Sequence, residues 1–171
     1  MKKTLVILNK LKEGGLIDGY AIGGGIAVLF YVEPVFTSDL DIFCLIPAAK
    51  GKTIVSLSPI YDFLKKKGYK VHKEQVVIEG VPVQFIPAYN ELIEDSVKEA
   101  KEVDYEGLKT RVVGLEHLLA IMLQTNRPKD RERIFLILGE TKVKKESLNK
   151  ILKKHNLMGK WKEISKLYDK K

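Results

Sequence analysis

The segment Tyr20–Phe43 constrains the fold more than any other part of the chain, because it places two aspartates in otherwise apolar sequence. Asp39 and Asp41 are two residues apart, and residues at this spacing on a strand point to the same face, about 6.5 to 7 Å apart. Two carboxylates this close repel each other unless a cation lies between them. Oxygen ligands suit Mg²⁺ or Mn²⁺, which usually bind substrate phosphates as well. The segment therefore predicts a strand with a divalent-cation site.

Three consecutive glycines, residues 23–25, follow a short predicted strand over 20–22 and precede a predicted helix over 26–31. Backbone N–H groups at a helix start attract anions, and glycines lack the Cβ atoms that would keep a phosphate away from the backbone. Together with the aspartates, the glycines predict a metal–nucleotide site. The alternative interpretation is a tight strand–helix junction followed by a turn with an exposed carboxylate.

The rest of the pattern predicts an α/β (α+β) fold: a small mixed sheet with helices, followed by a helical C-terminal segment. Two β-type runs, 69–78 and 81–88, are separated by Glu79–Gly80, which is typical hairpin chemistry. The other predicted strands span 40–46 and 108–114, and the predicted helices span 4–13, 58–67, 90–101, 115–123, 128–138, 147–155 and 161–168. We expect a core over residues 1–114 and a helical segment over 115–171 packed against it.

Composition argues against a membrane-spanning protein but does not decide whether the partner is a nucleic acid. No apolar run approaches the roughly 20 residues that span a bilayer, so we expect a cytoplasmic protein with no membrane partner. The net charge of +8 fits polyanionic partners such as nucleic acid, and it equally fits the Lys/Glu-rich surface of a thermophile protein. The single cysteine, Cys44, lies in an apolar strand and is expected to be a buried small hydrophobic residue.

The glycines and aspartates resemble the motif of the polymerase-β-like nucleotidyltransferase superfamily, in which a glycine pair precedes Asp-apolar-Asp by ten to thirteen residues. Here thirteen residues separate Gly24–Gly25 from Asp39–Leu40–Asp41. The chain is similar to minimal prokaryotic members, in particular the AbiEii-type toxin nucleotidyltransferases, whose core is followed by a helical part. "GVPVQFIPAYN" and "GLEHLLAIMLQTNRPKDRERI" look like later landmarks of such sequences. The resemblance covers residues 20–138.

This resemblance implies an Mg²⁺- or Mn²⁺-dependent enzyme that moves a nucleoside monophosphate from a nucleoside triphosphate (NTP) to an acceptor hydroxyl or phosphate. The acceptor would be RNA (for example a tRNA end), a protein or a small molecule. The enzyme would be the toxin-like half of a two-gene system with a cognate antitoxin-like partner. Asp39 and Asp41 would be the catalytic, metal-holding residues. The nucleotide-binding residues would include Gly23, Gly24, Gly25, Thr37 and Ser38, although the two hydroxyls equally suit a turn-stabilising role.

One departure from the family pattern bears on catalysis. Many members carry a third carboxylate on a later strand, and Gln84 stands at the position expected for it. An amide cannot act as a general base. Glu74 and Glu79 flank the hairpin and either substitute for that acid or are solvated surface charges. The alternative function is therefore a catalytically weakened nucleotide-binding or protein-interaction module that keeps the fold.

The sequence "RPKDRER" supplies a further pair of candidates after the sheet region. In AbiEii-like proteins a basic residue and an aspartate on the C-terminal helices contribute to the site, which here points to Lys129 and Asp130. A proline at a helix start followed by an acid in the first turn is also ordinary helix capping. Both interpretations stay open at this stage.

Overall fold

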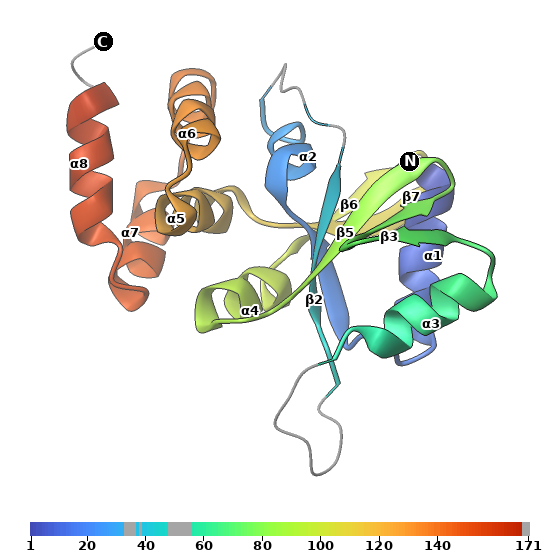
Figure 1. Ribbon diagram of the computed structural model, residues 1–171. Coiled ribbons are helices and arrows are strands. Elements are labelled where there is room, and N and C mark those ends of the chain that lie inside the picture. The colour runs from blue at the N-terminus through green and yellow to red at the C-terminus, as the bar shows by residue number, and fades with distance from the viewer. Residues whose placement is uncertain (33–36, 38, 48–55, 169–171) are drawn as a thin grey trace.

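The computed structural model describes residues 1–32, 37, 39–47 and 56–168. Within these ranges seven strands form one mixed sheet in the order β3-β4-β5-β2-β1-β7-β6 (Figure 1). The strands are β1 (Gly19–Ile22), β2 (Leu40–Leu45), β3 (Lys70–His72), β4 (Gln75–Ile78), β5 (Val81–Pro87), β6 (Lys101–Tyr105) and β7 (Leu108–Val112). The mixed α/β fold expected from the sequence is confirmed.

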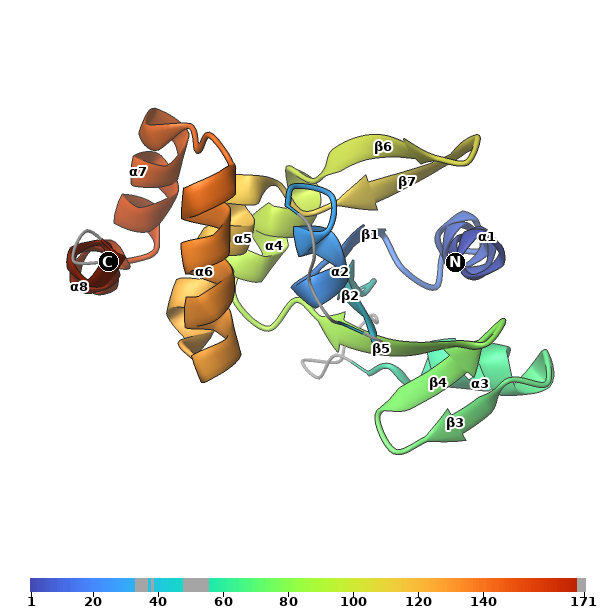
Figure 2. The ribbon, with the colours of Figure 1, turned by 90° about the horizontal axis from the view of Figure 1, so that it is seen from above.

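The same ranges contain eight helices, which lie on both faces of the sheet. They are α1 (Lys2–Glu13), α2 (Gly24–Val28), α3 (Ser58–Lys66), α4 (Glu91–Lys98), α5 (Leu115–Thr125), α6 (Pro128–Glu140), α7 (Lys145–Lys154) and α8 (Met158–Tyr168). Helices α1 and α3 cover one face, and α2 and α4 cover the other (Figures 1 and 2). Helices α5 to α8 stack outward on the α2–α4 side (Figure 2). None of the helices in the described ranges is long and apolar enough to cross a membrane.

The central strand β2 determines where the site lies. It pairs with β1 in antiparallel register and with β5 in parallel register, so that Asp41 faces Gln84 on the neighbouring strand. The Gly23 N–H also donates a 2.9 Å hydrogen bond to the Asp41 carbonyl. Leu40, Ile42 and Cys44 alternate with Asp41 along β2, and their side chains are buried in the hydrophobic core, as expected for Cys44. Burial raises the pKa of the Cys44 thiol to about 12, which keeps it unreactive.

Helix α5 is buried among several other helices of the structure. All residues from Leu115 to Leu123 are buried, and α5 contacts α2, α4, α6 and α7. A helix that is apolar around most of its circumference has to be surrounded by other elements. The C-terminal helices are therefore joined to the sheet through a shared apolar core that includes α5.

The observed elements differ from the expected ones in three places. The run 69–78 is two strands, β3 and β4, joined by a turn in which Lys73 has a φ of +54°. Strand β6 was not expected: helix α4 ends at Lys98, and Lys101, the last residue of the expected helix, is the first residue of β6. Helix α2 begins at Gly24, so two of the three glycines lie inside the helix. The first two differences have separate causes: the turn at Lys73 lacks glycine, and β6 is an edge strand with charged, exposed residues.

If α5 is part of one common core, Leu119→Ala should lower the free energy of unfolding by about 2–5 kcal/mol, because the Leu119 side chain is fully buried. Urea denaturation monitored by circular dichroism measures this change. Leu167→Ala on α8 is the matched control, since Leu167 is 52% exposed and should change stability by less than about 0.5 kcal/mol. Equal effects of the two substitutions would contradict the position of α5 in the core.

Candidate active site

The Asp41 carboxylate rests directly on the backbone of Gly24. A Cβ atom added to Gly24 would overlap the Oδ2 atom of Asp41, and Gly24 also has a φ of +55°, which L-residues with side chains rarely adopt. Both features require glycine at this position. In this structure Gly24 therefore makes room for the carboxylate, a role that the sequence pattern did not indicate.

The neighbouring glycines make room for other groups. A Cβ atom at Gly25 would lie 2.6 Å from Nη2 of Arg133 and 2.8 Å from Oγ1 of Thr37. A Cβ atom at Gly23 would overlap the ring of Phe43 in the same way. The glycine segment is thus a point of close approach between α2, the β2 strand and helix α6.

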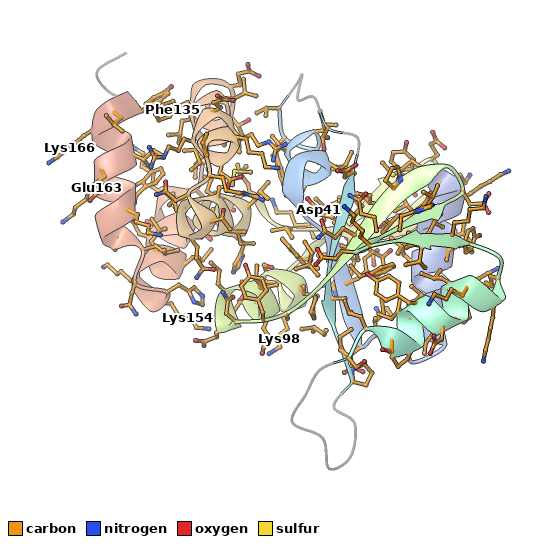
Figure 3. All side chains as sticks on the ribbon, in the orientation of Figure 1. Asp41, Lys98, Phe135, Lys154, Glu163 and Lys166 are labelled. Atoms are coloured by element: carbon orange, nitrogen blue, oxygen red, sulfur yellow. The ribbon has the colours of Figure 1, made fainter. Side chains whose placement is uncertain are left out.

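Asp41 lies on β2 (Figure 3), and burial and nearby charges shift the pKa of its carboxyl in opposite directions. Burial raises the pKa of the Asp41 carboxyl above its usual value, and the nearby charge of Asp39 raises it further. The positive charges of Lys129 and Arg133 on α6 and of Arg127 at its N-cap act against this and lower it. The net shift of the Asp41 pKa is upward, because burial has the largest effect.

The corner between α5 and α6 is held by Asp130, which is 1% exposed. Its Oδ2 accepts hydrogen bonds from Thr125 Oγ1 at 2.7 Å and from Arg127 Nε at 2.7 Å, and its Oδ1 accepts one from Arg127 Nη2 at 3.1 Å. The Arg127 backbone N–H also donates to Oδ2 at 3.2 Å. These are helix-capping contacts, and they keep the Arg127 guanidinium beside the site. A direct role of Asp130 in nucleotide binding stays a prediction.

A cavity of about 200 Å³ lies between the sheet and helices α5 and α6. Its apolar lining comes from β2, β5 and α5. The polar side chains in its lining are those of Asp41, Gln84, Thr125, Arg127, Asp130 and Arg133. Tyr89, which is 60% exposed, stands among the lining residues. A cavity with an apolar wall and a few convergent charged groups is the usual form of a small-ligand site.

The donor set at Asp39 and Asp41 fits Mg²⁺ or Mn²⁺ that arrives with a nucleotide. The part of the chain that the structure describes contains no group of three or more His, Cys, Asp or Glu side chains able to hold a metal. Mg²⁺ characteristically binds through one or two carboxylates plus substrate phosphates and keeps several waters. The oxygen ligands of the two aspartates fit that mode.

Gln84 occupies the position facing Asp41 on the adjacent strand, as the sequence suggested for the missing acid. Its Nε2 lies 3.4 Å from Oε2 of Glu74, which places Glu74 at the edge of the site. Glu79 lies at the far end of the hairpin, where its carboxylate accepts a 2.8 Å hydrogen bond from Tyr69. Of the two acids considered from sequence, only Glu74 reaches a residue of the cavity lining.

The structure brings together most of the candidate residues from the sequence. Gly24, Asp41 and Asp130 line one cavity. Gly25 lies close to Thr37 and Arg133, and Gly23 lies close to Phe43. The charges of Asp39 and Lys129 act on Asp41. Ser38 lies outside the described residues. Arg133 was missed, although residues 127, 130 and 133 are three apart and share one face of α6, which is a signal that the sequence contains.

Comparison with solved structures shows what kind of fold this is. An antigenic nucleotidyltransferase-like protein from Paracoccidioides brasiliensis matches with a TM-score of 0.56 and 16% identity, over 97% of this chain and 90% of that chain. The antibiotic-resistance factor ANT(2'')-Ia matches with a TM-score of 0.53 and 16% identity, over 99% and 98% of the two chains. The sequence itself matches no model of a known protein family and none of the curated proteins compared with it. The fold is that of nucleotidyltransferase-like proteins, and the AbiEii-type likeness remains a prediction.

The contact between Gly24 and Asp41 predicts an energetic coupling between the two positions. Gly24→Ala should destabilise the protein more than Gly68→Ala, because both glycines have positive φ but a Cβ at Gly68 would meet nothing within 4 Å. The shared backbone strain costs about 1–2 kcal/mol, and Gly24→Ala must also displace the carboxylate. Adding Asp41→Ala to Gly24→Ala should recover about 0.5–3 kcal/mol of that loss. A double-mutant cycle by urea denaturation measures this, and strictly additive effects would contradict the contact.

The Asp130 network predicts a pH-dependent contribution to stability. Burial alone would raise the pKa of Asp130, but its hydrogen bonds from Arg127 and Thr125 outweigh burial and lower it. The stabilisation is therefore complete above about pH 4, the ordinary aspartate range, and is lost as the pH falls through the lower folded-state pKa. Asp130→Asn should lower the free energy of unfolding by about 1.5–3 kcal/mol at pH 7.

The difference between wild type and Asp130→Asn should shrink between pH 4 and pH 2, and urea denaturation over that range measures it. Glu132→Gln, an exposed position on the same helix, is the control and should have little effect at any pH. A deficit of Asp130→Asn that is the same at pH 7 and at the acid end would show that charge is not its cause.

Proposed function

We propose that this protein is an Mg²⁺- or Mn²⁺-dependent nucleotidyltransferase that moves a nucleoside monophosphate from an NTP to an acceptor. The observation that carries the proposal is the arrangement around Asp41. On a nucleotidyltransferase-like fold, its carboxylate lies against the Gly24 backbone, beside the charge of Asp39 and opposite three cations of α6. Carboxylates for a metal and cations for phosphates at one cavity edge are the two requirements of a metal–nucleotide site.

The protein's own groups divide into two sets in this proposal. Asp39 and Asp41 would hold the metal ion, which when bound would stabilise negative charge on the attacked phosphorus. Gly24, Gly25 and Thr37 would lie along the triphosphate, with Lys129 adding positive charge from α6. The apolar wall from β2, β5 and α5 would exclude water from one side of the nucleotide, which strengthens the electrostatic interactions inside the cavity.

The reaction would form one bond and break one. An acceptor oxygen bonds to the α-phosphorus of the NTP, and the bond from that phosphorus to the bridging oxygen breaks, so that pyrophosphate leaves. A hydroxyl acceptor loses its proton in the process. Gln84 cannot take that proton. We assign this task to the Glu74 carboxylate, whose Oε2 lies 3.4 Å from the Gln84 amide nitrogen.

The acceptor and the cellular role are finer parts of the proposal. An RNA or tRNA end, a protein side chain or a small molecule would each offer a suitable hydroxyl. A role as the toxin-like half of a two-gene system, with a cognate antitoxin-like partner, is supported by the resemblance of the residue 20–138 region to AbiEii-type proteins. The net charge of +8 supports a polyanionic acceptor.

A second candidate function is a nucleotide-binding or protein-interaction module without catalytic activity. The observation in its favour is the register of β2 and β5, which places the Gln84 amide opposite Asp41 where a third carboxylate would complete the site. This module would bind a metal–NTP complex and release no pyrophosphate. The two candidates are therefore separated by turnover and not by binding.

The test is a thermal-shift and calorimetric series with each of the four NTPs, with and without Mg²⁺ or Mn²⁺. The wild type should be stabilised by about 2.7 kcal/mol when the NTP is at a hundred times its dissociation constant, and the shift should require the metal. Asp39→Asn and Asp41→Asn should each lose the metal-dependent shift and nucleotide transfer, because each removes a metal ligand. Asp62→Asn, an exposed carboxylate on α3 at the other face of the sheet, should retain both.

Transfer is followed as pyrophosphate release with labelled NTP and pools of RNA, protein and small molecules. An Asp39→Asn protein that transfers nucleotide as well as wild type would overturn the enzyme proposal. Metal-dependent binding without pyrophosphate release in any pool would favour the non-catalytic module. No binding of any NTP would exclude the enzyme and the nucleotide-binding module, and would leave a protein-interaction module that keeps the fold.

A further inference from the structure

Arg133 differs from the other two arginines near the start of α6. Arg127 forms an ion pair with Asp130 at 2.7 Å, and Arg131 donates a 2.8 Å hydrogen bond to Oδ1 of Asn126. Within the described residues, Arg133 has no ion pair at 4 Å or less. Its charge is therefore not committed to a structural contact of that kind.

The position of the Arg133 guanidinium is set by the absence of a side chain on Gly25. A Cβ atom at Gly25 would lie 2.6 Å from Nη2 of Arg133, closer than such atoms approach in proteins. The same hypothetical Cβ would lie 2.8 Å from Oγ1 of Thr37. The guanidinium therefore occupies the space above the glycine backbone that a phosphate would have to enter.

Arg133 also lies near the aspartate that is proposed to bind the metal. It lines the same cavity as Gly24 and Asp41. The Asp41 carboxylate lies against Gly24, and the Arg133 guanidinium approaches the next residue, Gly25. The guanidinium is a planar group with several donors that matches phosphate oxygens in two-point contacts. The Arg133 side chain is thus close both to the space above Gly25, where a phosphate would bind, and to Asp41, a proposed metal ligand.

We propose that Arg133 is the phosphate-binding arginine of this site and has two alternating tasks. Without nucleotide, its positive charge lies above Gly25, near the Asp41 carboxylate. When a metal–nucleotide complex binds, the metal binds the aspartates and the guanidinium binds the triphosphate. This inference rests on the proposed function. It places the triphosphate of the bound nucleotide where α2 and α6 meet, at Gly25 and Arg133.

The two tasks predict effects of opposite sign for two simple ligands. Arg133→Ala should weaken binding of inorganic tripolyphosphate with Mg²⁺ by about ten- to a hundredfold, the loss expected for a hydrogen bond to a charged group. The same substitution should tighten binding of Mn²⁺ alone by about two- to tenfold, because a positive charge near the metal ligands is removed. A merely structural role would weaken both ligands or neither.

Isothermal titration calorimetry of the full chain measures both constants, with tripolyphosphate used because it has no base. Arg131→Ala is the matched control, being an arginine on the same helix that is bonded to Asn126, and it should change neither constant by more than twofold. Arg133→Lys keeps the charge but loses the two-point contact, so it should bind Mn²⁺ like wild type and tripolyphosphate more weakly. This variant keeps the test decisive if Arg133→Ala unfolds.

The possible results distinguish a failure of the role proposed for Arg133 from a failure of the proposed nucleotidyltransferase function. Wild-type tripolyphosphate affinity in both Arg133 variants, with Mg-NTP binding intact, would overturn the role of Arg133 and leave the nucleotidyltransferase proposal standing. A wild-type protein that binds neither Mg-NTP nor tripolyphosphate would overturn the proposed function itself. Weaker tripolyphosphate binding together with tighter Mn²⁺ binding in Arg133→Ala supports both.

Discussion

The contact between the Asp41 carboxylate and the Gly24 backbone is the constraint on which the site depends. Strand pairing between β1 and β2, together with the 2.9 Å hydrogen bond from Gly23 N–H to the Asp41 carbonyl, holds the two motifs at one point of the sheet. At that point there is space for a carboxylate only if residue 24 has no side chain. The glycines and the aspartates are therefore one structural unit, although thirteen residues separate Gly25 from Asp39.

The start of helix α6 brings positive charges close to the glycines and aspartates of the site. Buried α5 anchors them to α2 and α4, and the Asp130 network turns the chain so that α6 begins beside the site. Lys129, Arg127 and Arg133 then act on Asp41 from a different part of the chain. Burial still has the largest effect on the pKa of Asp41, which stays above its usual value. In the proposed function, the ligand for this carboxylate is a divalent metal that arrives with a nucleotide.

The parallel register of β2 and β5 determines which side chain of the neighbouring strand lies beside Asp41. Gln84 faces Asp41, and the nearest acid beyond it, Glu74, is on the turn between β3 and β4. Two carboxylates without a third leave part of any metal coordination shell to substrate oxygens and water. The same fold occurs in nucleotidyltransferase-like proteins at 16% identity, so the fold tolerates large changes of sequence.

Local sequence determined much of this protein. The apolar strands, the Glu79–Gly80 hairpin, the four C-terminal helices and the combination of glycines with paired aspartates were all predicted from short-range patterns, because hydrophobic periodicity and turn chemistry act within a few residues. Strand β6 and the turn at Lys73 were not, because a charged edge strand and a turn without glycine lack those patterns. Only the tertiary structure decided that Gly24 accommodates Asp41, that Asp130 binds Arg127 and Thr125, and that Arg133 lies above Gly25. These contacts join residues of different elements, and the packing of α5 and the register of β2 determine which of them meet.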